Sequence, residues 1–258
     1  MAGPVSHYTF LPWFRTGLGS AVKNTEDGRA NVDVTIKALI AGVEEPFSKH
    51  VHLISPGDLI GIDPRAVVRV EPRPFTNEFE PNYLAAIEFF DEDYPWRYSP
   101  SKPDADGHKD HLDPWIALLV LEEGEFTLKD QGEGLPRSVS IKNTSILPPP
   151  EELWAWAHSH LNAVVADQTK PRATADQIAA NPAVSCSRII AARHLLPEKA
   201  YHAFLVPAFE SGRRAGLLSK DGPNRPYAWD RVSPGVELPV YYEWSFRTST
   251  KGDFKELA

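Results

Sequence analysis

The sequence has a single cysteine and no long apolar run. Cys186 has no second cysteine with which to form an internal disulfide, and one thiol in 258 residues fits a reducing compartment. No apolar stretch approaches the ~20 residues of a membrane-spanning helix. The first residues, MAGPVSHYTF, lack the basic and apolar regions of a signal peptide. We therefore expect a cytoplasmic protein that does not bind membranes.

Clustered basic charge and the common catalytic motifs are also missing. The net charge is −8 and the densest basic cluster is the pair Arg213 and Arg214, whereas nucleic-acid binding needs a clustered basic surface. G-x-S-x-G, H-E-x-x-H and G-x-x-x-x-G-K-[ST] do not occur. The glycines at 17 and 19 lack the third glycine of a dinucleotide loop. We expect neither a nucleic-acid partner nor a cofactor, and we interpret Cys186 as a packing residue.

Proline, by contrast, is abundant. The chain contains 24 prolines, roughly twice the average usage of about 5%. Each one fixes φ and removes a backbone donor, so long helices are disfavoured and short strands joined by stiff turns are favoured. The sequence predicts one α+β domain over 1–258, mainly β, with a mixed or antiparallel sheet core and a few helices.

Hydrophobic patterning predicts where the strands lie. Residues 30–40 alternate apolar and polar side chains, which is typical of a half-exposed strand. Residues 84–90 and 116–121 are apolar on both faces and predict interior strands, with a one-turn helix as the alternative for 84–90. Further strands are predicted at 47–54, 66–70, 125–128, 137–141, 187–195, 201–206 and 238–246, with 187–195 and 201–206 forming one hairpin.

One amphipathic helix is predicted over about 150–165. Pro150 and two glutamates suit its first turn, and Trp156 and Leu161 fall on a helical stripe that should face the core. Trp154 and His158 share the opposite face, which is a candidate interface. His158 and His160 would then point about 200° apart, and His160 would be a core histidine. Short accessory helices are predicted after residue 174 and over 209–218.

Two groups of histidines have residue types that bind metals. His50 and His52 share a strand face, with Asp58 or Asp63 as a third ligand. The second group lies in a loop and consists of His108, Asp110, His111 and Asp113. Neither group has an evident complete ligand set, so we interpret both as solvated polar residues and expect no bound metal.

Glu88 interrupts an apolar strand, where a carboxylate must be paired or protonated. Arg69 or Arg97 could pair with it. The alternative is a general acid with a raised pKa that works with Asp91 or Asp93.

The segment after this strand combines three carboxylates with a rigid aromatic turn. Asp91, Glu92 and Asp93 repel one another and need a partner, for which Arg97 is nearest in sequence; Tyr94, Pro95 and Trp96 lie between. In one interpretation the turn locks the strand to its neighbours, with Trp96 buried. In the other it is a docking surface, with Trp96 partly exposed.

Several phrases together resemble an uncharacterised group of larger bacterial proteins: YTFLPW, FEPNYLAAIEFFDEDYPWRY, PPPEELWAWAHSHLN, YHAFLVPAFESGRRAGL and YYEWSFRTSTKGDF. The resemblance brings no established activity, so it assigns no catalytic residue. It implies a link to phage-tail-like or contractile-injection particles and a chain that continues past GDF.

Three functions are consistent with these observations. The first is a non-enzymatic structural or scaffolding module that binds protein partners through aromatic and acidic surface. The second is a hydrolase with a histidine–carboxylate metal site or a carboxylate pair at Glu88 and Asp91. The third is binding of a small ligand or carbohydrate by exposed aromatic side chains.

Overall fold

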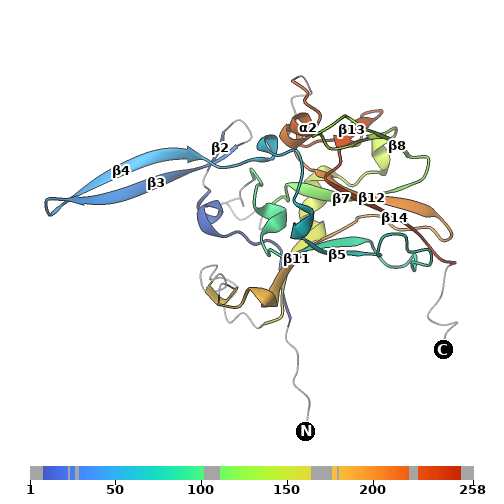
Figure 1. Ribbon diagram of the computed structural model, residues 1–258, viewed down its shortest axis with the longest axis horizontal. Coiled ribbons are helices and arrows are strands. Elements are labelled where there is room, and N and C mark those ends of the chain that lie inside the picture. The colour runs from blue at the N-terminus through green and yellow to red at the C-terminus, as the bar shows by residue number, and fades with distance from the viewer. Residues whose placement is uncertain are drawn as a thin grey trace, which may run out of the picture.

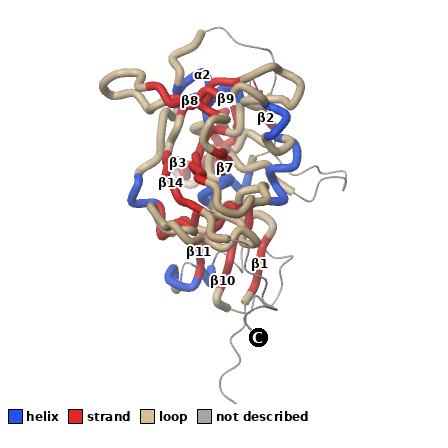
Figure 2. The backbone as a smooth tube through the Cα atoms, turned by 90° about the vertical axis from the view of Figure 1, so that its right-hand side faces the viewer, coloured by secondary structure: helices blue, strands red, loops and turns tan. Residues whose placement is uncertain are grey.

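A computed structural model describes residues 8–22, 24–26, 29–101, 111–163, 176–178, 180–220 and 226–250. Within these ranges the fold is mainly β, as the sequence predicts, with its strands arranged in antiparallel sheets. Three sheets stack as layers of the body, and a fourth projects from it (Figure 1 and Figure 2). No helix in these ranges is long and apolar enough to span a bilayer.

One outer layer is a five-stranded sheet, and it carries the acidic turn predicted at residues 91–97. Its order is β1 (Thr9–Leu11), β10 (Ala157–Leu161), β11 (Ser185–Ile190), β6 (Ala86–Phe89) and β5 (Val67–Glu71). The interior strand predicted at 84–90 is β6, which pairs with β11 on one side and β5 on the other. Ile87 and Phe89 of β6 are buried in the core.

The middle layer is a three-stranded sheet with the order β14 (Tyr242–Arg247), β12 (Ala200–Pro207) and β7 (Ile116–Glu122). Residues 116–121 are all buried, because the layers on both sides cover this sheet. The prediction of a strand buried on both faces is confirmed, although β7 is an edge strand of its own sheet.

The third layer contains β13 (Val236–Pro239), β9 (Ser138–Ile141) and β8 (Phe126–Lys129), with helix α2 (Glu210–Gly216) packed nearby. Residues 176–178 and 180 are α-helical, as predicted after residue 174. The described ranges also contain short 3-10 segments: η1 (Gly17–Ala21), η2 (Pro56–Asp58), η3 (Pro64–Ala66), η4 (Tyr94–Trp96), η5 (Thr144–Ile146), η6 (Pro150–Trp156) and η7 (Pro182–Val184). Their brevity is what the proline content predicts.

The fourth sheet is β2 (Asn24–Glu26), β3 (Arg29–Ile40) and β4 (Val43–His52). β3 and β4 form one long hairpin that points away from the body (Figure 1), and we call this hairpin the arm. A two-residue turn closes it, with Ala41 at φ 50° and Gly42 at φ 83°. Two positive φ values are the signature of the type I′ turn that suits a twisted hairpin.

The prediction of a helix over 150–165 is correct only for its first half. Pro150 does start a helical segment, but η6 ends at Trp156 and residues 157–161 form β10. The segment AHSHL alternates buried and half-buried side chains, and pairing with β1 and β11 selects the strand. Leu161 is buried as predicted, but Trp154 and Trp156 are both half-buried, so the predicted contrast between them is absent.

Two strand predictions near the C-terminus also need correction. β11 and β12 were expected to form one hairpin, but they belong to different layers, because β11 pairs with β6 whereas β12 pairs with β7. The strand predicted at 238–246 is two strands, β13 and β14, in different sheets. The brief helix predicted at 209–218 is confirmed as α2.

Candidate functional site

The acidic turn after β6 is built around a buried tryptophan. Trp96 has 0% of its surface exposed, and its indole Nε1 donates to the Leu112 carbonyl at 2.8 Å. The guanidinium of Arg15 donates to the carbonyls of Trp96 and Ser99. Burial lowers the pKa of Arg15 to about 10, and the charge of Asp93 only partly offsets this. The burial of Trp96 is what the structural-lock interpretation expects.

Arg97 holds the first and third carboxylates of the turn. It bonds Asp91 at 2.8 Å and Asp93 at 2.5 Å, while its guanidinium lies 5.5 Å from the centre of the Tyr94 ring. Burial alone would lower the pKa of Arg97, but the hydrogen bonds to Asp93 and Asp91 outweigh it and raise the pKa. The partner expected from sequence is therefore present.

Serines of the five-stranded sheet fasten the same turn. Ser159 on β10 donates to the Glu92 carbonyl at 2.5 Å, and Ser187 on β11 donates to the Asp91 carbonyl at 2.7 Å. The Glu92 carboxylate accepts from Ser185 at 3.2 Å, and burial raises its pKa. The turn is thus tied to two neighbouring strands. A docking role for it remains a prediction.

Trp154 and His158, which were expected to share one helix face, have different surroundings. The Trp154 ring stacks on His111 at 4.1 Å between centroids. His158 lies on β10, where the Phe10 ring contacts both His158 at 5.4 Å and His160 at 4.9 Å. The two histidines therefore share a face, because alternate residues of a strand point the same way. Burial, followed by the charge of Arg188, lowers the pKa of both.

Glu88 lies between two arginines on the same sheet face. Arg69 on β5 donates to both of its carboxylate oxygens, through Nε at 2.5 Å and Nη2 at 3.1 Å. Arg188 on β11 donates through Nε at 2.7 Å and makes a closer contact through Nη2. Burial would raise the pKa of Glu88, but these hydrogen bonds outweigh it and lower the pKa. That is the opposite of the shift that a general acid needs.

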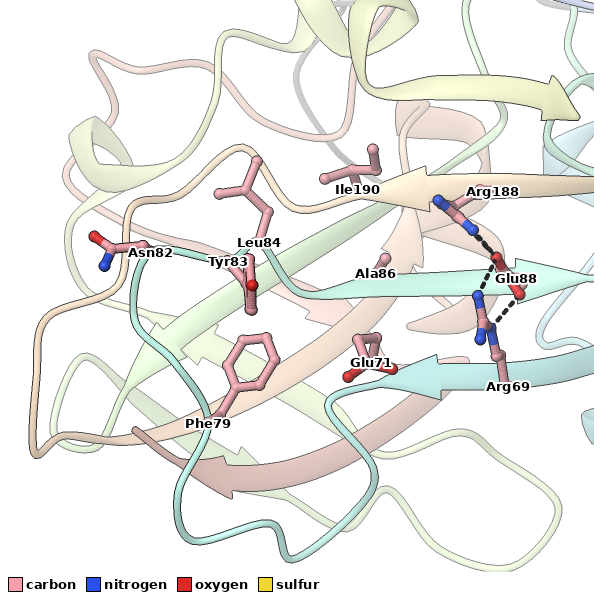
Figure 3. Close-up of a pocket in the computed structure, with 10 residues that line it drawn as sticks. All are labelled: Arg69, Glu71, Phe79, Asn82, Tyr83, Leu84, Ala86, Glu88, Arg188 and Ile190. Carbon is pink, nitrogen blue, oxygen red and sulfur yellow. Dashed lines mark hydrogen bonds and ion pairs between the residues drawn. The ribbon is translucent and has the colours of Figure 1, made fainter. Parts of the chain in front are cut away.

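A pocket of about 490 Å³ opens beside this ion-pair row (Figure 3). Phe79, Tyr83, Leu84 and Ile190 line its apolar side, and the two guanidinium groups lie at its other end. The thiol of Cys186 lies next to this row, and burial followed by the charge of Glu88 raises its pKa. A thiol with a raised pKa is less nucleophilic, in agreement with the packing interpretation.

The predicted metal ligands do not come together in the described residues. His50 and His52 share a strand face, as predicted, with rings 5.2 Å apart, but His50 bonds Asp33 at 3.0 Å. Asp113 accepts from Tyr227 at 3.0 Å, and His108 and Asp110 lie outside the described residues. Within the described ranges, no three His, Cys, Asp or Glu residues are arranged to hold a metal ion. The expectation of no metal remains a prediction.

The arm carries a surface that the sequence alone did not reveal. One of its faces is apolar, and the large side chains there are 52% to 64% exposed: Ile36, Ile40, Val43 and Phe47. The alternation in 30–40 correctly predicted an apolar face. It did not show that this face would lie on a projecting hairpin, away from the core.

The opposite face of the arm is polar, with cross-strand pairs that satisfy one another. These are Asp33 with His50, Thr35 with Ser48 and Lys37 with Glu44. Leu39 is an apolar residue on this face. The arm is therefore amphipathic, and beyond its buried base at residues 30–32 both faces carry exposed side chains.

No protein-family model, curated protein or solved structure matches this chain.

Proposed function

We propose that the chain is a non-enzymatic protein-interaction module that docks to a partner protein through the apolar face of the arm. One observation supports this most strongly: four large apolar side chains lie more than half exposed on one face of a projecting hairpin. Exposed large apolar side chains gathered on one face in this way often mark a surface that another molecule covers.

The base of the arm is fixed to the body, which suits a docking element. Ala30, Asn31 and Val32 are buried there, and the Leu53 amide extends the β3–β4 ladder by donating to the Ala30 carbonyl at 2.9 Å. Arg29 also forms an ion pair with Asp58. A fixed base limits the orientations of the apolar face and lowers the entropy lost on binding.

Photocrosslinking tests this proposal, with neighbouring positions on opposite faces as matched controls. A photoreactive phenylalanine analogue replaces Phe47 on the apolar face or Ser48 on the polar face, and the protein is irradiated in its native cells. We expect defined adducts from position 47 and few from position 48. Equal labelling at the two positions, or none at position 47, would contradict docking through this face.

Two finer parts of the proposal rest on sequence alone. The cytoplasm as the site of docking is supported by the single cysteine. A phage-tail-like particle as the assembly is supported only by the sequence resemblance. Fractionation of cells that express the chain tests both: a position in the cytoplasm and sedimentation with large particles are the expected results.

A second candidate function is binding of a small apolar ligand in the pocket beside Glu88. It is favoured by the pocket's apolar wall and its volume, which lies in the range of small-molecule sites. We expect an environment-sensitive apolar dye to bind the parent and to bind Leu84→Arg at least tenfold more weakly, because a charged side chain enters the apolar wall. Unchanged dye affinity would contradict use of this pocket.

A further inference from the structure

We infer that the partner of the arm is a second copy of this chain, and that the two apolar faces pack face to face with their strands antiparallel. This inference rests on the proposed function of the arm. It follows from the charge pattern of β4, from the edge chemistry of the hairpin and from the register of its strands.

The charges on the apolar face are arranged in a self-complementary way. Glu45 and Lys49 lie on either side of Phe47 on the same face of β4, each about 7 Å from it along the strand. Both are exposed, and neither forms an ion pair within the described ranges of the chain. A face that carries one acidic and one basic group, equally spaced about an aromatic side chain, can pair with a copy of itself.

The symmetry of such a pair is fixed by these charges. Two identical faces meet isologously about a two-fold axis that lies in the contact plane. An axis through Phe47 perpendicular to the strands places Glu45 of each copy over Lys49 of the other. An axis parallel to the strands along β4 places Lys49 over Lys49, and like charges in contact are destabilising. An axis along the midline of the hairpin places Glu45 over Ala38 and Lys49 over Val34, which leaves both charges without a partner. The antiparallel arrangement is therefore favoured.

The same arrangement matches the apolar side chains along the arm. In the hairpin register Ile36 lies beside Phe47, and Ile40 lies beside Val43 at the tip. With Phe47 at the centre, the tip of each arm reaches toward the base of the other. Ile36 and Phe47 of each copy then cover the same residues of the other, whereas Ile40 and Val43 lie over the base of the other arm near Val51, where Val32 is already buried.

Pairing along the edge of the hairpin is less favourable than pairing through its face. Counted from the Ile40 and Val43 pair that closes the two-residue turn, Pro46 and Lys37 form a non-hydrogen-bonded pair. A non-proline residue at position 46 would point its N–H outward at the edge of β4. Proline removes that donor, which is a known means of blocking strand addition at an edge.

The expected dimer is weak. A two-stranded ribbon of ten residue pairs has a face of roughly 330 Å², from a width of about 10 Å and a length of about 33 Å. Stable interfaces bury about 800 Å² on each partner. We therefore expect a dissociation constant on the order of 100 µM for contacts between the arms alone.

Charge reversal tests the inference. Sedimentation velocity of the full 258-residue chain between about 5 and about 500 µM measures the dimer constant of the parent, Glu45→Lys, Lys49→Glu and the double swap. Each single change replaces two attractive contacts by two repulsive ones, so we expect dimerisation at least tenfold weaker. The double swap restores the attraction and should return to within about threefold of the parent.

The control is the corresponding swap on the polar face, Lys37→Glu with Glu44→Lys, which should leave the dimer constant within about threefold. Melting curves confirm that the variants fold, as expected for exposed positions. A parent that is monomeric at 500 µM, a double swap as weak as the singles, or an equal loss from the control swap would each overturn the inference. If a monomeric parent still gives photoadducts from position 47 to a different protein, the arm docks but not to itself. If it gives none, the proposed function fails as well.

Discussion

The row formed by Arg69, Glu88 and Arg188 leads to a quantitative prediction, because its two arginines differ in exposure. The Glu88 side chain is 9% exposed, whereas Arg188 is 27% and Arg69 is 60% exposed. Glu88→Gln keeps the shape and one acceptor oxygen but removes the charge that both guanidiniums contact. Hydrogen bonds to charged groups contribute about 1.5–3 kcal/mol, so we expect the free energy of unfolding to fall by about 2–3 kcal/mol.

The two arginine variants serve as controls for each other. Arg69→Ala removes a mostly exposed ion pair, and such pairs contribute about 0–1 kcal/mol to the free energy of unfolding. Arg188→Ala removes the better-buried partner and should cost more than Arg69→Ala. Urea unfolding at pH 7 measures all three variants, and a cost of Arg69→Ala equal to or larger than that of Arg188→Ala would refute the assignment of roles.

The pH dependence of Glu88→Gln has a definite sign. The folded-state pKa of Glu88 lies below its ordinary value of 4.5, so its charge stabilises the fold fully above pH 4.5. This contribution is lost as the pH falls through the lowered folded-state pKa. The difference between parent and Glu88→Gln should therefore shrink as the pH is lowered from 7 toward 3. A difference that stays constant would show that the charge is not the cause.

Four further variants test other parts of the structure. Trp96→Ala should lower the free energy of unfolding by about 3–5 kcal/mol, the range for large core aromatics, and a melting curve like that of the parent would contradict the lock. Gly216→Ala should cost about 1–3 kcal/mol by overpacking, because its Cβ would lie 2.5 Å from Pro239. Gly61→Ala has no atom within 4 Å of the new Cβ and should be near neutral in the same urea titration; equal costs would refute the packing argument. Ala41→Asn should stabilise the arm by up to about 1 kcal/mol, since asparagine tolerates positive φ better than alanine; hydrogen exchange of the arm amides should slow up to about fivefold, and faster exchange would contradict the turn assignment.

Much of the strand content could be predicted because burial leaves a periodic trace. Continuous apolar character over 116–121 identified β7, and alternation over 30–40 identified β3. The segment AHSHL was mispredicted because His160 and Leu161 fit the same helical stripe as Trp156. Only the pairing of β10 with β1 and β11 distinguishes a strand from a helix here, and these partners are distant in sequence.

The sites show the same limit. Arg97 was predictable as a partner of the carboxylates because it follows them by a few residues. Arg188 was not, since it lies 100 residues from Glu88 and only the register of β11 against β6 brings them together. For the arm, alternation predicts that one face is apolar but not what, if anything, covers it.

The order in which the strands are synthesised gives the arm a further consequence. β1 is fastened by β10, and the Thr9 hydroxyl reaches the Ala163 carbonyl across 154 residues of chain. At about 5–20 residues per second, the ribosome completes that partner roughly 8–30 s after β1. Among the described residues, the strands of the arm, by contrast, pair only with each other and with β2 just before them, and a hairpin closes within about 10 µs. The arm can therefore close on the nascent chain while the rest is still being translated, but a lone hairpin is only marginally stable, so a lasting arm awaits the burial of residues 30–32.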